Sequence, residues 1–142
     1  MNCAINENME VSLHDCHTNK VDLDLESITF YIPDGFYIIK DSSFKSNNNA
    51  KVKCHFLDNF DNFNVYIYEQ NILKKTIRKD YTNEFISKIN KGEFEFEFVT
   101  TYRAYQYILF KGYIWQDKKP YHKECEIEIH TDEITYSCKE DV

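Results

Sequence analysis

The stretch Glu93-Phe94-Glu95-Phe96-Glu97-Phe98 alternates carboxylate and aromatic side chains, and Glu124-Cys125-Glu126-Ile127-Glu128-Ile129 alternates carboxylate and apolar side chains in the same way. Successive side chains of a β-strand point to opposite faces, so this alternation predicts strands that are buried on one face only. Each strand should present three glutamates to solvent. Solvent-facing strand positions usually mix several polar residue types, so two all-acidic rows raise the question of which cationic surface they meet.

Further alternating or apolar runs predict strands throughout the rest of the chain. They fall at residues 9–13, 21–26, 28–32, 36–39, 51–57, 63–69, 71–79, 93–99, 102–116, 122–130 and 133–138. We expect the long run 102–116 to break near Lys111-Gly112 and the polar residues 41–49 to form a loop. The turn Pro33-Asp34-Gly35 predicts a hairpin over residues 28–39, because proline presets φ at the first turn corner and glycine accepts a positive φ.

One helix is predicted, over residues 80–91. Asp80 or Thr82 can cap its first turn, its apolar residues share one face, and Gly92 suits the position after its last turn. Sequential strands joined by short turns favour antiparallel pairing. We therefore expect a mainly β (α+β) fold, either an antiparallel meander sheet or a partly open barrel, with one short helix near residues 80–91.

Length and charge limit the classes of protein. The 142 residues predict a single globular domain, 1–142, and the net charge of −7 disfavours unassisted binding to nucleic-acid phosphate or to an anionic membrane. A basic protein is the expected charged partner. We find neither a basic and apolar leader nor a run of about 20 apolar residues, which predicts a cytoplasmic location.

Five cysteines are scattered along the chain without a Cys-x-x-Cys pair, at Cys3, Cys16, Cys54, Cys125 and Cys138. This odd, unpaired set predicts reduced thiols that act mostly as small core residues. Zinc is an alternative, because the segments His14-Asp15-Cys16-His17 and His122-x-x-Cys125 place imidazoles near thiols. Their spacing does not match structural zinc sites. A Cys-His nucleophile pair would require an electropositive setting that the sequence does not indicate.

Several readings remain open for the acidic rows. They can be an ordinary solvated face, they can be neutralised by internal cations such as Lys74, Lys75, Arg78 and Lys79, or they can meet a basic partner. A divalent metal could also bind Glu93 and Glu95, or Glu126 and Glu128, but no further ligand stands at a fixed spacing. We predict no metal site, no cofactor and no catalytic residue.

The segment 102–116 is rich in aromatic residues. It can be a central strand that is buried on both faces, or it can expose the Tyr, Trp and Arg composition that is typical of binding hot spots. The candidate partner-binding residues are therefore Glu93, Glu95, Glu97, Glu124, Glu126, Glu128, Tyr105, Tyr107 and Trp115.

No glycine-rich phosphate loop, nucleophile elbow or paired zinc knuckle is present in the sequence, so we expect a binding protein and not an enzyme. The acidic, Asn-, Ile-, Lys- and Tyr-rich composition, with Leu13-His14-Asp15-Cys16-His17 and Ile32-Pro33-Asp34-Gly35-Phe36, resembles bacterial immunity proteins that accompany polymorphic or contact-dependent toxins. The resemblance implies a stoichiometric inhibitor of a cognate, basic toxin such as a nuclease. The alternative is a β-domain that binds a small ligand or a metal and could be enzymatic.

Overall fold

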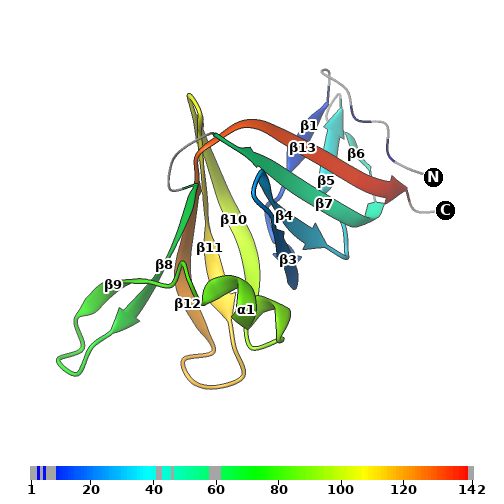
Figure 1. Cartoon of the computed structure of the whole chain (residues 1–142). Helices are drawn as coiled ribbons and strands as arrows, with labels where there is room; N and C mark the ends of the chain where they lie inside the picture. The colour runs from blue at the N-terminus through cyan, green and yellow to red at the C-terminus, as the bar shows by residue number, and fades with distance from the viewer. Residues whose placement is uncertain are drawn as a thin grey trace.

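The computed structural model describes residue 3, residue 5 and residues 9–40, 43–45, 47–57 and 62–140. Within these residues the chain is mostly strand, with one short helix, α1 (Phe85–Asn90) (Figure 1). The strands are β1 (Glu10–Ser12), β2 (Cys16–Thr18), β3 (Lys20–Leu23), β4 (Ser27–Ile32), β5 (Tyr37–Lys40), β6 (Ser43–Lys45), β7 (Asn47–Phe56), β8 (Phe63–Gln70), β9 (Thr76–Asp80), β10 (Glu95–Ala104), β11 (Tyr107–Trp115), β12 (His122–Ile129) and β13 (Thr131–Glu140).

All strand pairs are antiparallel, as predicted, and they form three sheets. The sheets have the orders β2-β10-β11-β12-β8-β9, β13-β7-β4-β3 and β1-β5-β6. The predicted meander is found in β10-β11-β12, and the described strands form three sheets, none of them a closed barrel.

The core lies between the six-stranded and the four-stranded sheet. Phe30 of β4 meets Phe98 of β10 and Phe110 of β11, each with ring centroids 5.7 Å apart in edge-on geometry. Phe96, Phe98, Ile127 and Ile129, which the alternation assigned to the core, are buried. The face of the six-stranded sheet that points to this core is called the inner face below, and the opposite face is called the outer face.

Helix α1 closes one end of the space between these two sheets (Figure 1). Its Phe85 and Ile89 are buried, and the Asn90 side chain accepts a hydrogen bond from the Val21 backbone N–H and donates one to the Val21 carbonyl, at 2.9 Å each. The helix is shorter than the predicted 80–91. Asp80 ends β9, and Thr82 bonds to Asp80 and Val65, so neither residue caps the helix.

The predicted hairpin over residues 28–39 is wrong in its pairing, although its turn forms. Gly35 has φ +84° and its N–H donates to the Ile32 carbonyl. However, β4 pairs with β3 and β7, whereas β5 pairs with β1 and β6. The Asn47 side chain bonds to both the N–H and the carbonyl of Phe36, which holds the chain after the turn away from β4. Residues 43–45 and 47–49 of the predicted polar loop are strands, and residues 41, 42 and 46 lie outside the described chain.

Two further predictions are corrected at turns. Residues 71–79 are not one strand: the Asn71 N–H donates to the Lys75 carbonyl, and this turn joins β8 to β9. The run 102–116 breaks at Tyr105-Gln106 and not near Lys111-Gly112. Gly112 lies opposite a bulge in β10, where a Cβ atom would collide with the Glu97 carbonyl, so this glycine permits a close approach of two strands. The short strand β2 was not predicted.

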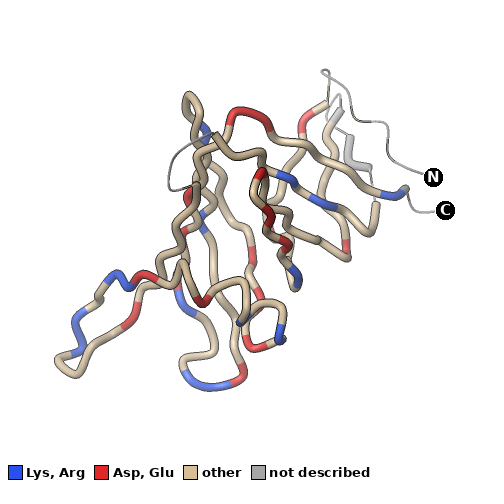
Figure 2. The backbone as a smooth tube through the Cα atoms, in the orientation of Figure 1, with Lys and Arg blue, Asp and Glu red and all other residues tan. Residues whose placement is uncertain are grey.

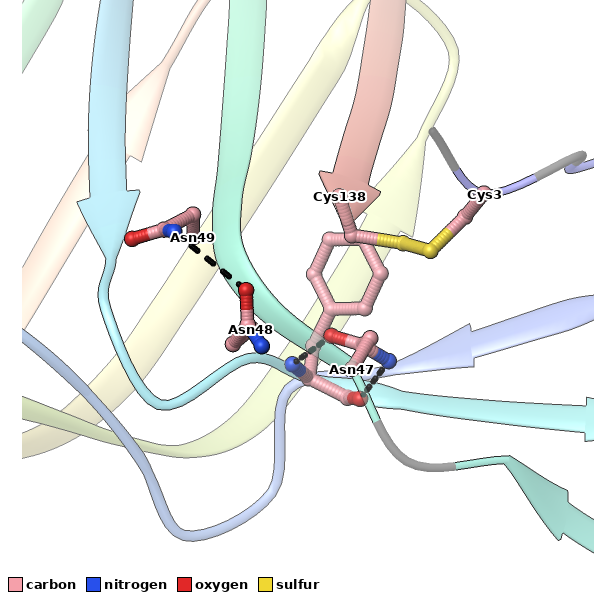
Figure 3. The surroundings of a disulfide bond; sticks show 6 residues. Cys3, Asn47, Asn48, Asn49 and Cys138 are labelled. Atoms are coloured by element: carbon pink, nitrogen blue, oxygen red, sulfur yellow. Dashed lines mark hydrogen bonds between the residues drawn. A yellow bond between two sulfur atoms is a disulfide. The ribbon is translucent and has the colours of Figure 1, made fainter. Parts of the chain in front are cut away.

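The prediction of five reduced cysteines is also wrong. Cys3 and Cys138 form a disulfide, with Cα atoms 5.3 Å apart, that joins the N-terminal segment to β13 (Figure 3). Cys16, Cys54 and Cys125 are free and buried, as predicted for small core residues. Burial raises the pKa of Cys16 to about 11 and that of Cys54 to about 12, so both thiols stay protonated and unreactive near neutral pH.

Candidate functional site

The outer face of the six-stranded sheet gathers most of the predicted partner-binding residues. Strand β11 pairs with β10 on one side and with β12 on the other, so the two acidic rows are not neighbours. The outward side chains of β11 between them are Tyr107, Leu109, Lys111, Tyr113 and Trp115. The rows therefore avoid direct repulsion, and aromatic residues occupy the space between them.

The carboxylates on the β10 side bond to β2 and β11. Glu95 accepts a hydrogen bond from His17 Nδ1 at 2.7 Å. Glu97 accepts one from Trp115 Nε1 at 2.9 Å and lies 4.0 Å from His17 Nε2. The Trp115 ring lies 5.0 Å from the His122 ring of β12. These contacts fix the Trp115 indole in one orientation while its ring remains partly open to solvent.

The carboxylates on the β12 side are held by tyrosine hydroxyls. Tyr68 donates to Glu126 at 3.0 Å, and Tyr107 donates to Glu128 at 3.2 Å. Asn64 also donates to Glu128, at 3.2 Å. Burial and the nearby Glu128 charge raise the pKa of Tyr107 to about 12, so the phenol remains a hydrogen-bond donor at neutral pH.

Two internal cations reach this face. The Arg78 guanidinium of β9 lies 3.5 Å from the centre of the Tyr66 ring and 3.9 Å from Glu126, and Lys111 lies 3.7 Å from Glu126. Arg78 was among the predicted internal cations. Both ion pairs involve half-exposed cations, so each contributes little to stability. Five glutamates and Asp80 face these two permanent cations, so the outer face keeps an acidic character.

Two predicted site residues are placed differently from expectation. Glu93 precedes β10 and pairs with Lys88 of the helix at 3.2 Å. Tyr105 stands almost fully exposed at the tip of the β10–β11 hairpin. Glu124 lies on the outer face as expected, but its carboxylate makes no hydrogen bond or ion pair with any side chain that the structure describes.

Sequence reasoning missed the tyrosines of β8, which complete the face. Tyr66 and Tyr68 alternate with the buried Val65 and Ile67, and this alternation was the signal that could have found them. A shallow depression of about 170 Å³ lies next to Tyr68. Its lining includes Tyr68, Tyr102, Lys111, Tyr113, Glu124 and Glu126.

The alternative metal and thiol readings find no geometric support. His122 is exposed on the outer face, whereas Cys125 is buried on the inner face, so the pair cannot meet one ion. Asp15 has φ 63°, which ends the predicted alternation in His14-Asp15-Cys16-His17. Nowhere in the described ranges do three or more His, Cys, Asp or Glu side chains gather as a metal site would require.

A second polar cluster lies on the inner side, near the end closed by the helix. Glu69 accepts hydrogen bonds from Lys123 at 2.9 Å and Tyr81 at 2.6 Å, and Lys79 lies 3.9 Å away. The Glu69 and Lys123 side chains are only 19% and 17% exposed. Burial alone would raise the pKa of Glu69, but these donors outweigh it and hold the pKa below its usual value. The cluster is a structural ion pair.

Comparisons with known proteins found no matching family model, no similar curated protein and no similar solved structure. The described part of the chain contains no helix long and apolar enough to cross a membrane.

Proposed function

We propose that this protein is a stoichiometric protein-binding inhibitor, a bacterial immunity protein that uses the outer face of its six-stranded sheet to bind a basic toxin. The observation that supports the proposal best is the composition of that face. Tyr66, Tyr68, Tyr107, Tyr113 and Trp115 alternate with five glutamates on a sheet surface that no described strand or helix covers. Aromatic residues with a polar handle are enriched in binding hot spots.

The hydrogen bonds of the face support a binding role over a merely solvated one. The Tyr68, Tyr107 and Trp115 donors are each held by a carboxylate, so little side-chain freedom remains to be lost when a partner binds. The surplus of carboxylates would attract a basic partner over long range. The Cys3–Cys138 disulfide is typical of oxidising compartments, which weighs against the predicted cytoplasmic location.

The first experiment is co-expression with the product of the neighbouring gene. If the proposal is right, that product alone is toxic, and this protein binds it in equimolar amounts and restores growth. A neighbouring product that is harmless, or that is neither bound nor neutralised, contradicts the immunity role. Ligand or metal binding by this protein would then become the leading interpretation.

Association kinetics with that product test the binding face. We compare one triple substitution on the face with a matched triple substitution of exposed acids on the other sheet. The face variant is Glu95→Gln, Glu97→Gln and Glu124→Gln, and the control is Glu26→Gln, Asp132→Asn and Glu133→Gln. The face variant should associate about tenfold more slowly at low salt, with the difference vanishing at high salt. If both variants slow association equally, the glutamates of the outer face have no special role, and the proposed binding face is wrong.

Dissociation kinetics separate aromatic anchoring from charge attraction. Trp115→Ala should raise the dissociation rate by about tenfold or more, because a hot-spot aromatic is lost. Tyr121→Ala is the matched control, since Tyr121 is an exposed aromatic residue in the β11–β12 loop, outside the acidic rows. If Tyr121→Ala raises the dissociation rate more than Trp115→Ala does, the interface lies at the β11–β12 loop and not on the outer face.

A further inference from the structure

Lysines gather toward one end of the molecule, which is formed by the projecting β8–β9 turn, the β11–β12 loop and helix α1 (Figures 1 and 2). We call this region the basic end. The β11–β12 loop and the base of the β8–β9 hairpin line one cavity, and the same loop and the helix line another, so the loop lies between the hairpin base and the helix, and the β8–β9 turn projects beyond that base. Its exposed lysines are Lys74, Lys75, Lys91, Lys118 and Lys119.

The farthest point of the basic end is apolar. Ile72 is 100% exposed and Leu73 is 75% exposed, at the tip of the projecting β8–β9 hairpin. The turn is rigidly built: the Asn71 carbonyl accepts from the Lys74 N–H, and the Asn71 side chain accepts from the Lys75 N–H. Two adjacent aliphatic side chains are thus held in water, next to two lysines.

Acidic groups are also present at this end, but they do not cancel its charge. Glu93 pairs with Lys88, and Glu84 and Asp117 stand beside the helix and the loop. The turn itself, residues 71–75, contains two lysines and no acid. Glu69 and Glu124 line the cavity at the base of the hairpin, and none of the five glutamates of the outer face belongs to the turn itself.

We propose that the basic end docks on an anionic lipid surface, with Ile72 and Leu73 entering the interfacial layer and the surrounding lysines meeting lipid headgroups. An exposed aliphatic pair gains free energy when it leaves water, and lysines near an anionic leaflet are attracted to it. The net charge of −7 argued against membrane binding for the chain as a whole. At about 0.1 M salt, however, charges more than roughly 10 Å away are screened, so the charge near the docking end decides the binding. The proposal is independent of the partner proposed for the outer face.

Vesicle co-sedimentation tests it directly with the full chain. The probe is a vesicle of phosphatidylcholine with about one third phosphatidylserine, at about 0.1 M salt, compared with pure phosphatidylcholine. Binding should occur to the anionic vesicle and fall steeply as salt is raised. Absence of binding to the anionic vesicle overturns the proposal. Binding of Ile72 and Leu73 in a pocket of a partner protein would then be the remaining interpretation of the exposed tip.

Two variants distinguish insertion from simple adsorption of charge. Ile72→Ser with Leu73→Ser should lower the partition coefficient by about tenfold or more, and Lys74→Gln with Lys75→Gln by about tenfold. The matched control is Leu25→Ser, because Leu25 is 97% exposed but lies on the turn between β3 and β4, among Asp22, Asp24 and Glu26. If the tip variant binds as well as the unaltered protein, or Leu25→Ser loses as much, the proposal is wrong.

A spectroscopic readout places the tip itself. In a Leu73→Trp, Trp115→Phe variant, the one tryptophan should shift its emission to shorter wavelength on anionic vesicles, because the indole leaves water. An unshifted spectrum with bound protein would show that the tip stays in solvent, and it would overturn insertion. Thermal unfolding of each variant checks that the fold is intact, as expected for side chains that are exposed.

Discussion

The two faces of strands β10 and β12 are made by the same two stretches of sequence, yet they have opposite chemistry. On the inner face, Phe96 and Phe98 lie with ring centroids 4.8 Å apart, and Phe98 meets Phe110 at 5.1 Å. On the outer face, Glu126 and Glu128 are held by tyrosine hydroxyls. The inner face loses water on folding and supplies stability, whereas the outer face keeps its charge and its hydrogen-bonding groups available. Stability should therefore be separable from the partner binding that we propose for the outer face.

The strongest test of this difference between the two faces is a cavity on the inner face, which should have the largest effect on stability. Phe96→Ala should lower the free energy of unfolding by about 3–5 kcal/mol, because transfer and cavity terms add at a fully buried ring. Chemical denaturation measures the change. Glu95→Gln, one position away on the outer face, is the control and should change it by no more than about 0.5 kcal/mol. Similar losses for both variants would mean that the strand register is wrong.

The Glu69–Lys123 pair is the polar exception on the inner side. Lys123→Met should cost about 1–3 kcal/mol, because it leaves a mostly buried carboxylate without its main donor. Lys88→Met is the control, since its pair with Glu93 is exposed and should be worth less than about 1 kcal/mol. An equal cost for the two substitutions would refute a special role for the buried pair.

The pH dependence of stability is a second test of the contribution of the Glu69–Lys123 pair. The folded-state pKa of Glu69 lies below the usual 4.5, so its stabilisation is present above that value and is lost as pH falls through the folded pKa. Glu69→Gln should therefore be less stable at neutral pH but lose less stability on acidification below about 4.5. Denaturation midpoints across the acid range measure this, and parallel profiles for both proteins would contradict it.

A smaller effect is expected from the hydrogen bonds of the outer face. Tyr107→Phe removes the donor to Glu128 and should cost about 0.5–1.5 kcal/mol, since Asn64 still bonds to that carboxylate. Tyr105→Phe makes the same chemical change at the exposed hairpin tip and should be neutral. If the two are indistinguishable in chemical denaturation, the tyrosines of the face are not held as described.

The smallest effect on stability should come from neutralising charge. The variant Glu95→Gln, Glu97→Gln and Glu124→Gln should change the free energy of unfolding by less than about 1 kcal/mol, because exposed ion pairs contribute little. A gain in stability would show residual repulsion between the rows. A loss comparable to that of Phe96→Ala would contradict the separation of stability from recognition.

Sequence patterns predicted the features that follow from local alternation. The core positions of β10 and β12, the mainly antiparallel arrangement and the position of the helix within residues 80–91 all depend on short-range periodicity. Pairing partners were not predictable in the same way. Nothing local to Pro33-Asp34-Gly35 reveals that Asn47 will bond to Phe36 and send β5 into another sheet.

The candidate site also has a part that local sequence patterns predicted and a part that depends on strand pairing. The acidic rows were visible in the sequence as alternating runs, and Trp115 was visible as part of the aromatic-rich segment 102–116. That β11 would stand between the rows, and that His17 of β2 would bond to Glu95, depends on strand order. The disulfide was missed because Cys3 and Cys138 are separated by 135 positions and share no motif.

The Cys3–Cys138 disulfide closes a covalent ring that contains the described strands β1 to β12 and β13 as far as Cys138. If the two ends were pulled apart, as in a single-molecule force experiment, tension would pass through the disulfide, and the sheets inside the ring would bear almost none. The oxidised protein should then extend only by the residues outside the ring. Mechanical unfolding of the sheets would begin only after a reductant opens the ring.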